Sequence, residues 1–259
     1  MTMRCAPVGE DFSQILSCIL DVGQTMLTAG SEVNRVEDTM ERMARAYGCK
    51  QVDVFTITSS IVVTVHDSQD AIYTQTRRIR EYETDIHKIE LCNALSREIC
   101  RKPLSREEFA ARIERITREK TFSWWIMCIG YVMVAASFTV FFGGSLTDAL
   151  ISGISGFLLY WVLQLFGRIR LQRIVTTILA SAMVGLIAAG SAKLGLGVSV
   201  DKICIGNVML LIPGISFTTS LRDMISGDTI SGLLGLVEAV LRALAIALGF
   251  ALVLWWFGL

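Results

Sequence analysis

A break in an apolar run near the end of the chain carries residues that could bind a small molecule. The ten residues 203–212 would form about 15 Å of helix, about half the thickness of a hydrocarbon core. Pro213 then removes a backbone donor, and Gly214 loosens the turn that follows. Lipid cannot satisfy the backbone groups left unpaired in this way, so they must line protein or a wet cavity. The sequence therefore predicts a discontinuous membrane helix.

The side chains around this break are of types that recognise a carboxylate. They include an amide, two hydroxyls and a guanidinium beside an acid, and the candidate substrate-binding set is Asn207, Pro213, Gly214, Thr218, Thr219, Arg222 and Asp223. Transporters present the ends of broken helices to substrates near the middle of the membrane, where hydroxyls and Arg can bind a carboxylate together. Alternatively, Pro213 ends the helix and residues 216–228 form a cytoplasmic loop. The residues alone leave both interpretations open.

Two charges lie deeper in the last apolar segment. Glu238 and Arg242 are four positions apart with the acid first, the favourable order for a helical ion pair. An isolated charge at this depth costs about 2.5 to 3.5 kcal/mol, so it persists when it is paired or functional. We predict an intramembrane ion pair, with either a structural or a direct transport role.

The sequence gives little support for catalysis, metal binding or phosphate binding. The two histidines, His66 and His87, have no nucleophile or carboxylate set at a useful spacing, and the seven cysteines, Cys5 among them, form no C-x-x-C pair. No phosphate-binding glycine loop is present. We expect reduced, mostly packed thiols, no cofactor, no metal and no enzyme activity. The formal net charge of zero gives no indication of a nucleic-acid partner.

Composition divides the chain into two domains that position these residues. Residues 1–122 hold 36 of the 48 charged residues, whereas residues 123–259 are dominated by apolar runs. Runs of about 20 apolar residues span a membrane. We predict a transmembrane domain over residues 123–259 with about five helices, at about 123–142, 146–166, 174–192, 200–217 and 231–257.

Residues 1–122 carry the patterns of a mixed domain. Apolar spacing predicts helices up to Gly30 and Gly48, the second with an N-cap at Ser31, and the Val-, Ile- and Thr-rich segment that follows predicts two or three antiparallel strands. Two further helices follow, the last opened by a capping box at Ser105–Glu108. The predicted fold class is an α-helical membrane protein with an N-terminal cytoplasmic α+β domain followed by the helix bundle.

The distribution of Lys and Arg orients the membrane domain. With the N-terminus in the cytoplasm, two basic residues, Lys193 and Lys202, flank the outer ends, and seven flank the inner ends: Arg115, Arg118, Lys120, Arg168, Arg170, Arg173 and Arg222. Basic residues favour cytoplasmic flanks. We therefore expect a multi-pass protein in the lipid bilayer with a cytoplasmic N-terminus.

Three segments together resemble the threonine/serine exporter family: "AGSEVNRVEDTMERMARAYG" at 29–48, "TRRI" after the strands, and "IPGISFTTSLRDMISGDTISGLLGLVEAVLRALAIALG" at 212–249. The resemblance covers nearly the whole chain. It implies the larger subunit of the split, succinate-exporter form, with a small hydrophobic membrane protein as partner, in a bacterial cytoplasmic (inner) membrane. It supplies no established set of catalytic residues.

The leading hypothesis is therefore a subunit of a secondary exporter for a succinate-like dicarboxylate or for threonine and serine. The alternative is a membrane-anchored regulatory or binding subunit, whose helices scaffold a complex without forming the pathway. Small residues recur at four-residue spacing in the apolar segments, which is compatible with a homo-oligomer. The sequence leaves open the substrate, the driving force, the stoichiometry and the role of the N-terminal domain. It also leaves open whether Arg222 lines the pathway.

Overall fold

The computed structural model describes residues 10–80, 82–119, 122–169, 171–196 and 198–258. Three residues used in the predictions above, Cys5, Lys120 and Arg170, lie outside these ranges. The chain forms two compact units, one of residues 1–121 with 215–236 and the other of residues 122–214 with 237–259. Below, the N-terminal domain means the described part of residues 10–119, and the bundle means the described part of the second unit.

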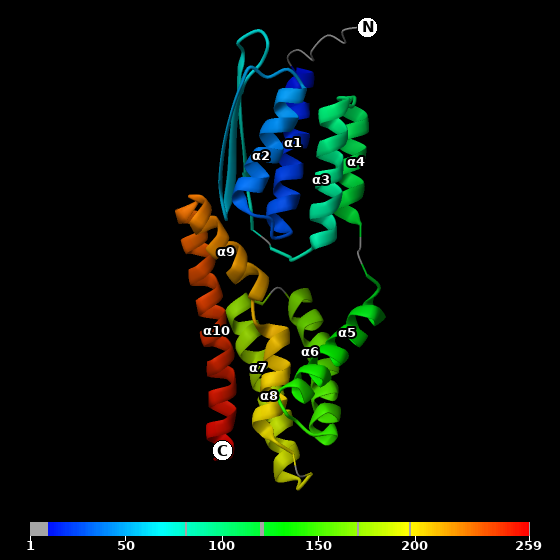
Figure 1. The fold of residues 1–259 in the computed structure, drawn as a ribbon, viewed down its shortest axis with the longest axis vertical. Coiled ribbons are helices and arrows are strands. Elements are labelled where there is room, and N and C mark those ends of the chain that lie inside the picture. The colour runs from blue at the N-terminus through cyan, green and yellow to red at the C-terminus, as the bar shows by residue number, and fades with distance from the viewer. Residues whose placement is uncertain (1–9, 81, 120–121, 170, 197, 259) are drawn as a thin grey trace. The chain divides into compact units, whose positions relative to one another are not determined.

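The N-terminal domain contains four helices and one sheet. Its elements are α1 Glu10–Thr28, α2 Val33–Ala46, β1 Gln51–Ile57, β2 Ser60–His66, β3 Ile72–Arg78, α3 Ile86–Arg101 and α4 Arg106–Arg118. Helix α1 contacts α2, α3, α4 and two of the strands. Figure 1 shows the sheet on one side of α1 and α2, with α3 and α4 on the other side of α1. The predicted α+β composition of this region is confirmed.

The sheet is antiparallel in the order β1-β2-β3. A two-residue turn joins β1 to β2, because Ile57 pairs directly with Ser60. On the central strand, Ile61, Val63 and Val65 are fully buried, whereas the residues between them are partly exposed. This period of two is what a strand with one face on a core requires. The buried side chains pack with the apolar faces of α1 and α2 in one core.

The helix ends agree with the sequence in three places and differ in one. Gly30 and Gly48 both have φ near +92°, a conformation that suits glycine after a helix. The predicted capping box is present, since Ser105 Oγ accepts from the Glu108 backbone and Glu108 accepts from the Ser105 backbone. The predicted N-cap at Ser31 is wrong. Helix α2 has Glu32 at its N-cap, and that side chain makes no capping hydrogen bond.

The apolar half of the chain is helical, and its membrane-length helices lie close to the predicted segments. Four described helices are long and apolar enough to cross a membrane: α5 Trp124–Phe141, α6 Leu146–Arg168, α7 Arg173–Lys193 and α10 Thr229–Phe257. Two shorter helices, α8 Val200–Leu211 and α9 Gly214–Ser226, form a pair bent by 54°, which gives a fifth span if the pair crosses as one. The protein is therefore a helical membrane protein with an N-terminal α+β part.

Close packing in the bundle depends on small residues. A Cβ added at Gly206 on α8 would lie 2.8 Å from the Ala135 carbonyl oxygen on α5 and would also meet the Thr139 side chain. A Cβ at Gly249 on α10 would lie 2.5 Å from the Ile178 carbonyl oxygen on α7. Both distances are shorter than a van der Waals contact, so these glycines allow the helix backbones to approach closely.

Candidate functional site

The break in the fourth apolar segment lies where the sequence predicts it. Helix α8 ends at Leu211, and Ile212 has the extended ψ of 127°. Pro213 follows, and α9 begins at Gly214. The residue before a proline is disfavoured in helical conformation, and proline itself cannot donate to the preceding turn. Two predicted site residues, Pro213 and Gly214, therefore form the break itself.

Asn207, on α8, is the predicted site residue with the most polar surroundings in the bundle. It is fully buried, and its Nδ2 donates to Ser152 Oγ on α6 at 2.8 Å and to the Ile203 carbonyl at 3.0 Å. Thr139 on α5 lies 2.7 Å from the same Ser152 oxygen. Both hydroxyls also reach the Ala135 carbonyl, at 2.9 and 3.0 Å. We call Thr139, Ser152 and Asn207 the amide cluster.

One atom of the amide cluster remains without a donor among the described residues. Asn207 Oδ1 is buried and accepts no hydrogen bond. Turning the amide over would not help, because Oδ1 would then face the Ile203 carbonyl oxygen, another acceptor, and Nδ2 would lose both of its acceptors. Leaving a buried acceptor unsatisfied costs about 1 to 3 kcal/mol. The amide cluster is therefore a place where a donor from outside the chain would be stabilised.

Asp148 is also buried in the bundle, but its hydrogen bonds explain it structurally. It forms a capping box with Ser145 at the beginning of α6, and its Oδ1 accepts from the Ser199 backbone at 2.7 Å. The carboxylate thus closes one helix end and holds the residue that precedes α8. We do not include it in the candidate site.

In the alternative interpretation, residues 216–228 form a cytoplasmic loop. The loop conformation is wrong, because this segment is helical up to Ser226, whereas its cytoplasmic position stays a prediction. Thr218 is exposed on this helix, and Thr219 is half-buried. Arg222 and Asp223 face the N-terminal domain: Arg222 forms an ion pair with Glu32, and Asp223 Oδ1 accepts from the Val33 backbone N–H at 3.2 Å.

These contacts explain why α2 lacks a cap of its own. Asp223 is buried and provides the carboxylate that the N-cap residue Glu32 does not provide. A carboxylate at this position satisfies an N–H of the first turn and lies at the positive end of the helix dipole. We call the contacts of Arg222 and Asp223 with Glu32 and Val33 the α2 clasp.

A second set of contacts joins the beginning of α10 to the same domain. Ser231 Oγ donates to the Thr56 carbonyl at 3.4 Å, and the Thr56 backbone N–H donates to Glu37 at 2.7 Å. Burial raises the pKa of Glu37, and the nearby Asp228 carboxylate adds to the increase. The corner between α9 and α10 thus places acidic groups against the N-terminal domain.

The predicted pair of Glu238 and Arg242 is formed in the bundle. Arg242 Nη2 lies 2.6 Å from Glu238 Oε1, and Arg173 at the beginning of α7 lies 3.7 Å from the same oxygen. The Glu238 side chain is 49% exposed in the chain alone. Sequence spacing identified the partners within one helix but could not identify Arg173, which is contributed by another helix.

Sequence reasoning also missed Thr139 and Ser152, the partners of Asn207. Each is one of several hydroxyl residues in an apolar helix, and such hydroxyls commonly bond the carbonyl four residues earlier, as Ser155 does with Ile151. A one-dimensional pattern therefore cannot distinguish a hydroxyl that bonds its own helix from one that bonds another.

Among the described residues, no group of three His, Cys, Asp or Glu side chains is arranged to hold a metal ion.

Comparison with known proteins identifies a family. The model of the family described as "Putative threonine/serine exporter" matches residues 17–256, which is most of the N-terminal domain and the whole described bundle except its last residues. No curated protein and no solved structure matches the chain.

Proposed function

Because the chain belongs to the threonine/serine exporter family, we propose that it is a subunit of a secondary exporter for small amino acids or small carboxylates. The observation that carries this proposal is the amide cluster, where the buried Asn207 Oδ1 lies between three helices and has no donor among the described residues. A polar solute that crosses the bundle needs such groups to replace its water.

The chemistry of the amide cluster favours an amino acid over a dicarboxylate as substrate. Serine and threonine carry ammonium and hydroxyl donors that can reach Asn207 Oδ1, whereas a succinate dianion carries no donor. A dicarboxylate would need a cation, and the predicted one, Arg222, is paired with Glu32. Threonine or serine is therefore the first substrate to test, with succinate as the second.

The wider proposal includes the partner and the membrane. We propose that a small hydrophobic membrane protein completes the transporter and that the pair resides in a bacterial cytoplasmic membrane with the N-terminal domain inside. The basic flanks Arg115, Arg118, Arg168, Arg173 and Arg222 support this orientation. The α2 clasp supports a second role for the N-terminal domain, as a regulatory domain that holds the segment following the helix break.

Reconstituted flux tests the proposal. The chain is inserted into proteoliposomes alone and with the small partner, and efflux of labelled serine, threonine and succinate is followed. We expect amino-acid flux that Asn207→Leu and Ser152→Ala reduce strongly while insertion stays normal. Ser155→Ala is the matched control, because that buried hydroxyl lies on the same helix as Ser152 and donates to the Ile151 carbonyl of its own helix.

The possible outcomes separate the hypotheses. If neither substrate class is transported with both proteins correctly inserted, the exporter proposal fails. If flux survives Asn207→Leu unchanged, the pathway does not use the amide cluster. If residues 212–228 can be replaced by a continuous Leu/Ala helix without loss of function, the scaffold alternative is preferred.

A further inference from the structure

A pocket in the N-terminal domain lies between the C-terminal half of α1, the segment leading into α3, and α4. Its volume is about 500 Å³, and its lining includes Asp21, Thr25, Asp85, Lys88, Glu114 and Thr117. Pockets of about 300 to 1,000 Å³ hold small metabolites. This pocket is part of the N-terminal domain, whereas the amide cluster belongs to the bundle, so transport across the bundle does not account for it.

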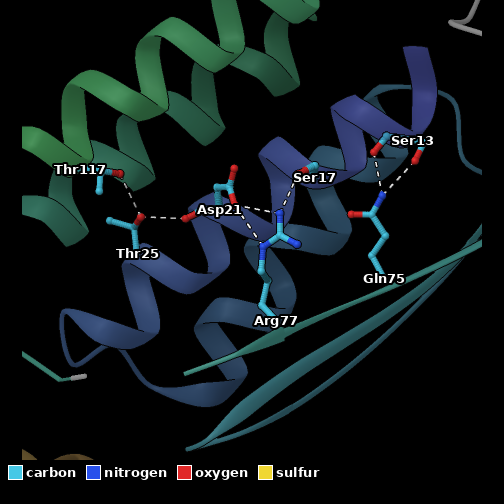
Figure 2. A network of polar contacts seen from close by, with 7 residues as sticks. All are labelled: Ser13, Ser17, Asp21, Thr25, Gln75, Arg77 and Thr117. Carbon is cyan, nitrogen blue, oxygen red and sulfur yellow. Dashed lines mark hydrogen bonds and ion pairs between the residues drawn. The ribbon is translucent and has the colours of Figure 1, made fainter. Parts of the chain in front are cut away.

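Two hydroxyl oxygens from different helices meet at the pocket wall. Thr25 Oγ1 on α1 and Thr117 Oγ1 on α4 lie 3.5 Å apart, and Figure 2 shows the two side chains pointing toward each other. Each hydroxyl donates its proton to a carbonyl of its own helix, Thr25 to Asp21 at 2.7 Å and Thr117 to Ile113 at 2.9 Å. Because both protons are used, the two oxygens can act together as acceptors.

Carboxylates extend this acceptor wall. Four acids, Asp21, Glu83, Asp85 and Glu114, line the pocket against two bases, Lys88 and Arg118. Asp21 is held in place by Arg77, which lies 3.2 Å from its Oδ1 and also donates to Ser17 at 2.6 Å (Figure 2). Counting Arg77, four carboxylates face three bases, so one carboxylate is in excess. This excess and the hydroxyl acceptors match a ligand that brings donors and positive charge.

The pocket also contains one cation suited to a ligand carboxylate. Lys88 Nζ is mostly buried and lies 3.8 Å from Asp85 and 3.9 Å from Glu83, both longer than a hydrogen bond. The N–H groups of Lys88 can therefore donate hydrogen bonds to a ligand carboxylate. A metal ion does not fit this arrangement, because the acids among the described residues do not converge in a group of three.

From this geometry we propose that the pocket binds a small metabolite bearing a primary ammonium group. The ammonium donates to the oxygens of Thr25 and Thr117 and lies beside the carboxylates of Asp21 and Glu114, which keep Arg77 and Arg118 as their other partners. If the ligand also carries a carboxylate, Lys88 binds it, which makes an amino acid one source of the ammonium and a simple diamine the other. An anion without donors is excluded from the site.

Calorimetric titration of the full-length chain in lipid nanodiscs tests the proposal with three probes: L-serine, putrescine and succinate. We expect saturable binding of serine, of putrescine or of both, and none of succinate. Binding of serine alone identifies an amino-acid site, and tighter binding of putrescine identifies an amine site. Hydrogen exchange should show ligand-dependent protection in α1 and α4, which distinguishes this pocket from the bundle.

Two variants and one control make the test specific. Glu114→Gln and Thr117→Val should each weaken binding by about tenfold or more, the loss expected for a hydrogen bond to a charged group. Glu41→Gln is the matched control, because Glu41 pairs with Arg45 four residues on, as Glu114 pairs with Arg118, but lies outside the pocket. Glu114 is largely exposed, so its replacement should leave the fold intact.

Several results would overturn the proposal. These are the absence of binding by both ammonium probes, binding of succinate as tight as theirs, affinity that Glu114→Gln and Thr117→Val do not change, and protection confined to the bundle. None of these results tests the exporter proposal, which is tested separately by flux in proteoliposomes.

Discussion

Removing the Asp223 carboxylate should loosen the first turn of α2, because this carboxylate accepts the hydrogen bond of the Val33 N–H. The two residues are 190 positions apart in the sequence. In Asp223→Ala the Val33 N–H loses its acceptor, and Glu32 does not replace it because its side chain makes no capping hydrogen bond. Loss of a cap costs about 1 kcal/mol, and loss of a charge at the helix N-terminus costs about 0.3 to 1 kcal/mol more. The expected total is about 1 to 2 kcal/mol.

Hydrogen exchange measured by mass spectrometry gives the local readout. A cost of about 1.4 kcal/mol is a tenfold change in an opening equilibrium. Exchange at residues 33–36 in full-length protein should therefore accelerate about fivefold to thirtyfold in Asp223→Ala. The last turn of α4, in the same domain, serves as the internal reference and should not change. Asp223→Asn keeps an acceptor and should show a smaller effect.

Arg222→Gln provides the contrasting variant. The Arg222 side chain is 60% exposed, and exposed ion pairs contribute about 0 to 1 kcal/mol. Its effect on α2 exchange should therefore be small. If Asp223→Ala leaves exchange at residues 33–36 unchanged, the capping explanation is refuted. If Arg222→Gln abolishes flux without affecting α2 or assembly, Arg222 belongs to the pathway rather than to the α2 clasp alone.

Three further predictions concern packing, pH and thiol access. Gly206→Ala should destabilise the bundle by forcing α8 away from α5. At Gly190 an added Cβ meets no atom within 4 Å, so Gly190→Ala should be neutral or stabilising by up to about 1 kcal/mol. Thermal unfolding in detergent compares the two variants. Because burial raises the pKa of Glu37, the native state binds the proton of the Glu37 carboxyl group more tightly than the unfolded chain does. That contribution to stability is complete below the unfolded pKa and is lost as pH rises through the raised folded value. Glu37→Gln should therefore flatten this part of the pH profile of unfolding and stabilise the neutral-pH protein; an unchanged profile would contradict the assignment. In a Cys5→Ser background, maleimide should label the exposed Cys100 in the native N-terminal domain, whereas Cys92, whose pKa burial raises to about 12, should react only after denaturation.

Local and periodic features were predictable from the sequence. The capping box at Ser105–Glu108, the glycine ends at Gly30 and Gly48 and the break at Pro213 all appear where the residues indicate. Each depends on interactions within one turn of helix or on apolar spacing along one element. Such interactions are short in sequence, so residue identity and position are enough to specify them.

The N-cap of α2 shows where local reasoning fails. Ser31 has the right residue type and an expected position, but the carboxylate that contacts the first turn comes from Asp223 on α9. A distant side chain can satisfy a helix end as well as a neighbouring one can. The residue that does so depends on how α9 packs against α2, which no local pattern contains.

In the amide cluster and in the pocket, too, the partners of a side chain come from other helices. The sequence by itself determined that Asn207 stands in an apolar helix beside a break, that the chain has a mixed N-terminal domain and an apolar helical half, and that Glu238 and Arg242 share one face of a helix. Only the tertiary structure decided that Asn207 meets Ser152, and that Thr25 faces Thr117 across two helices. The physical reason is that helix formation depends on hydrogen bonds between near neighbours, whereas a buried polar group finds its partners through packing between helices, where sequence distance has no influence.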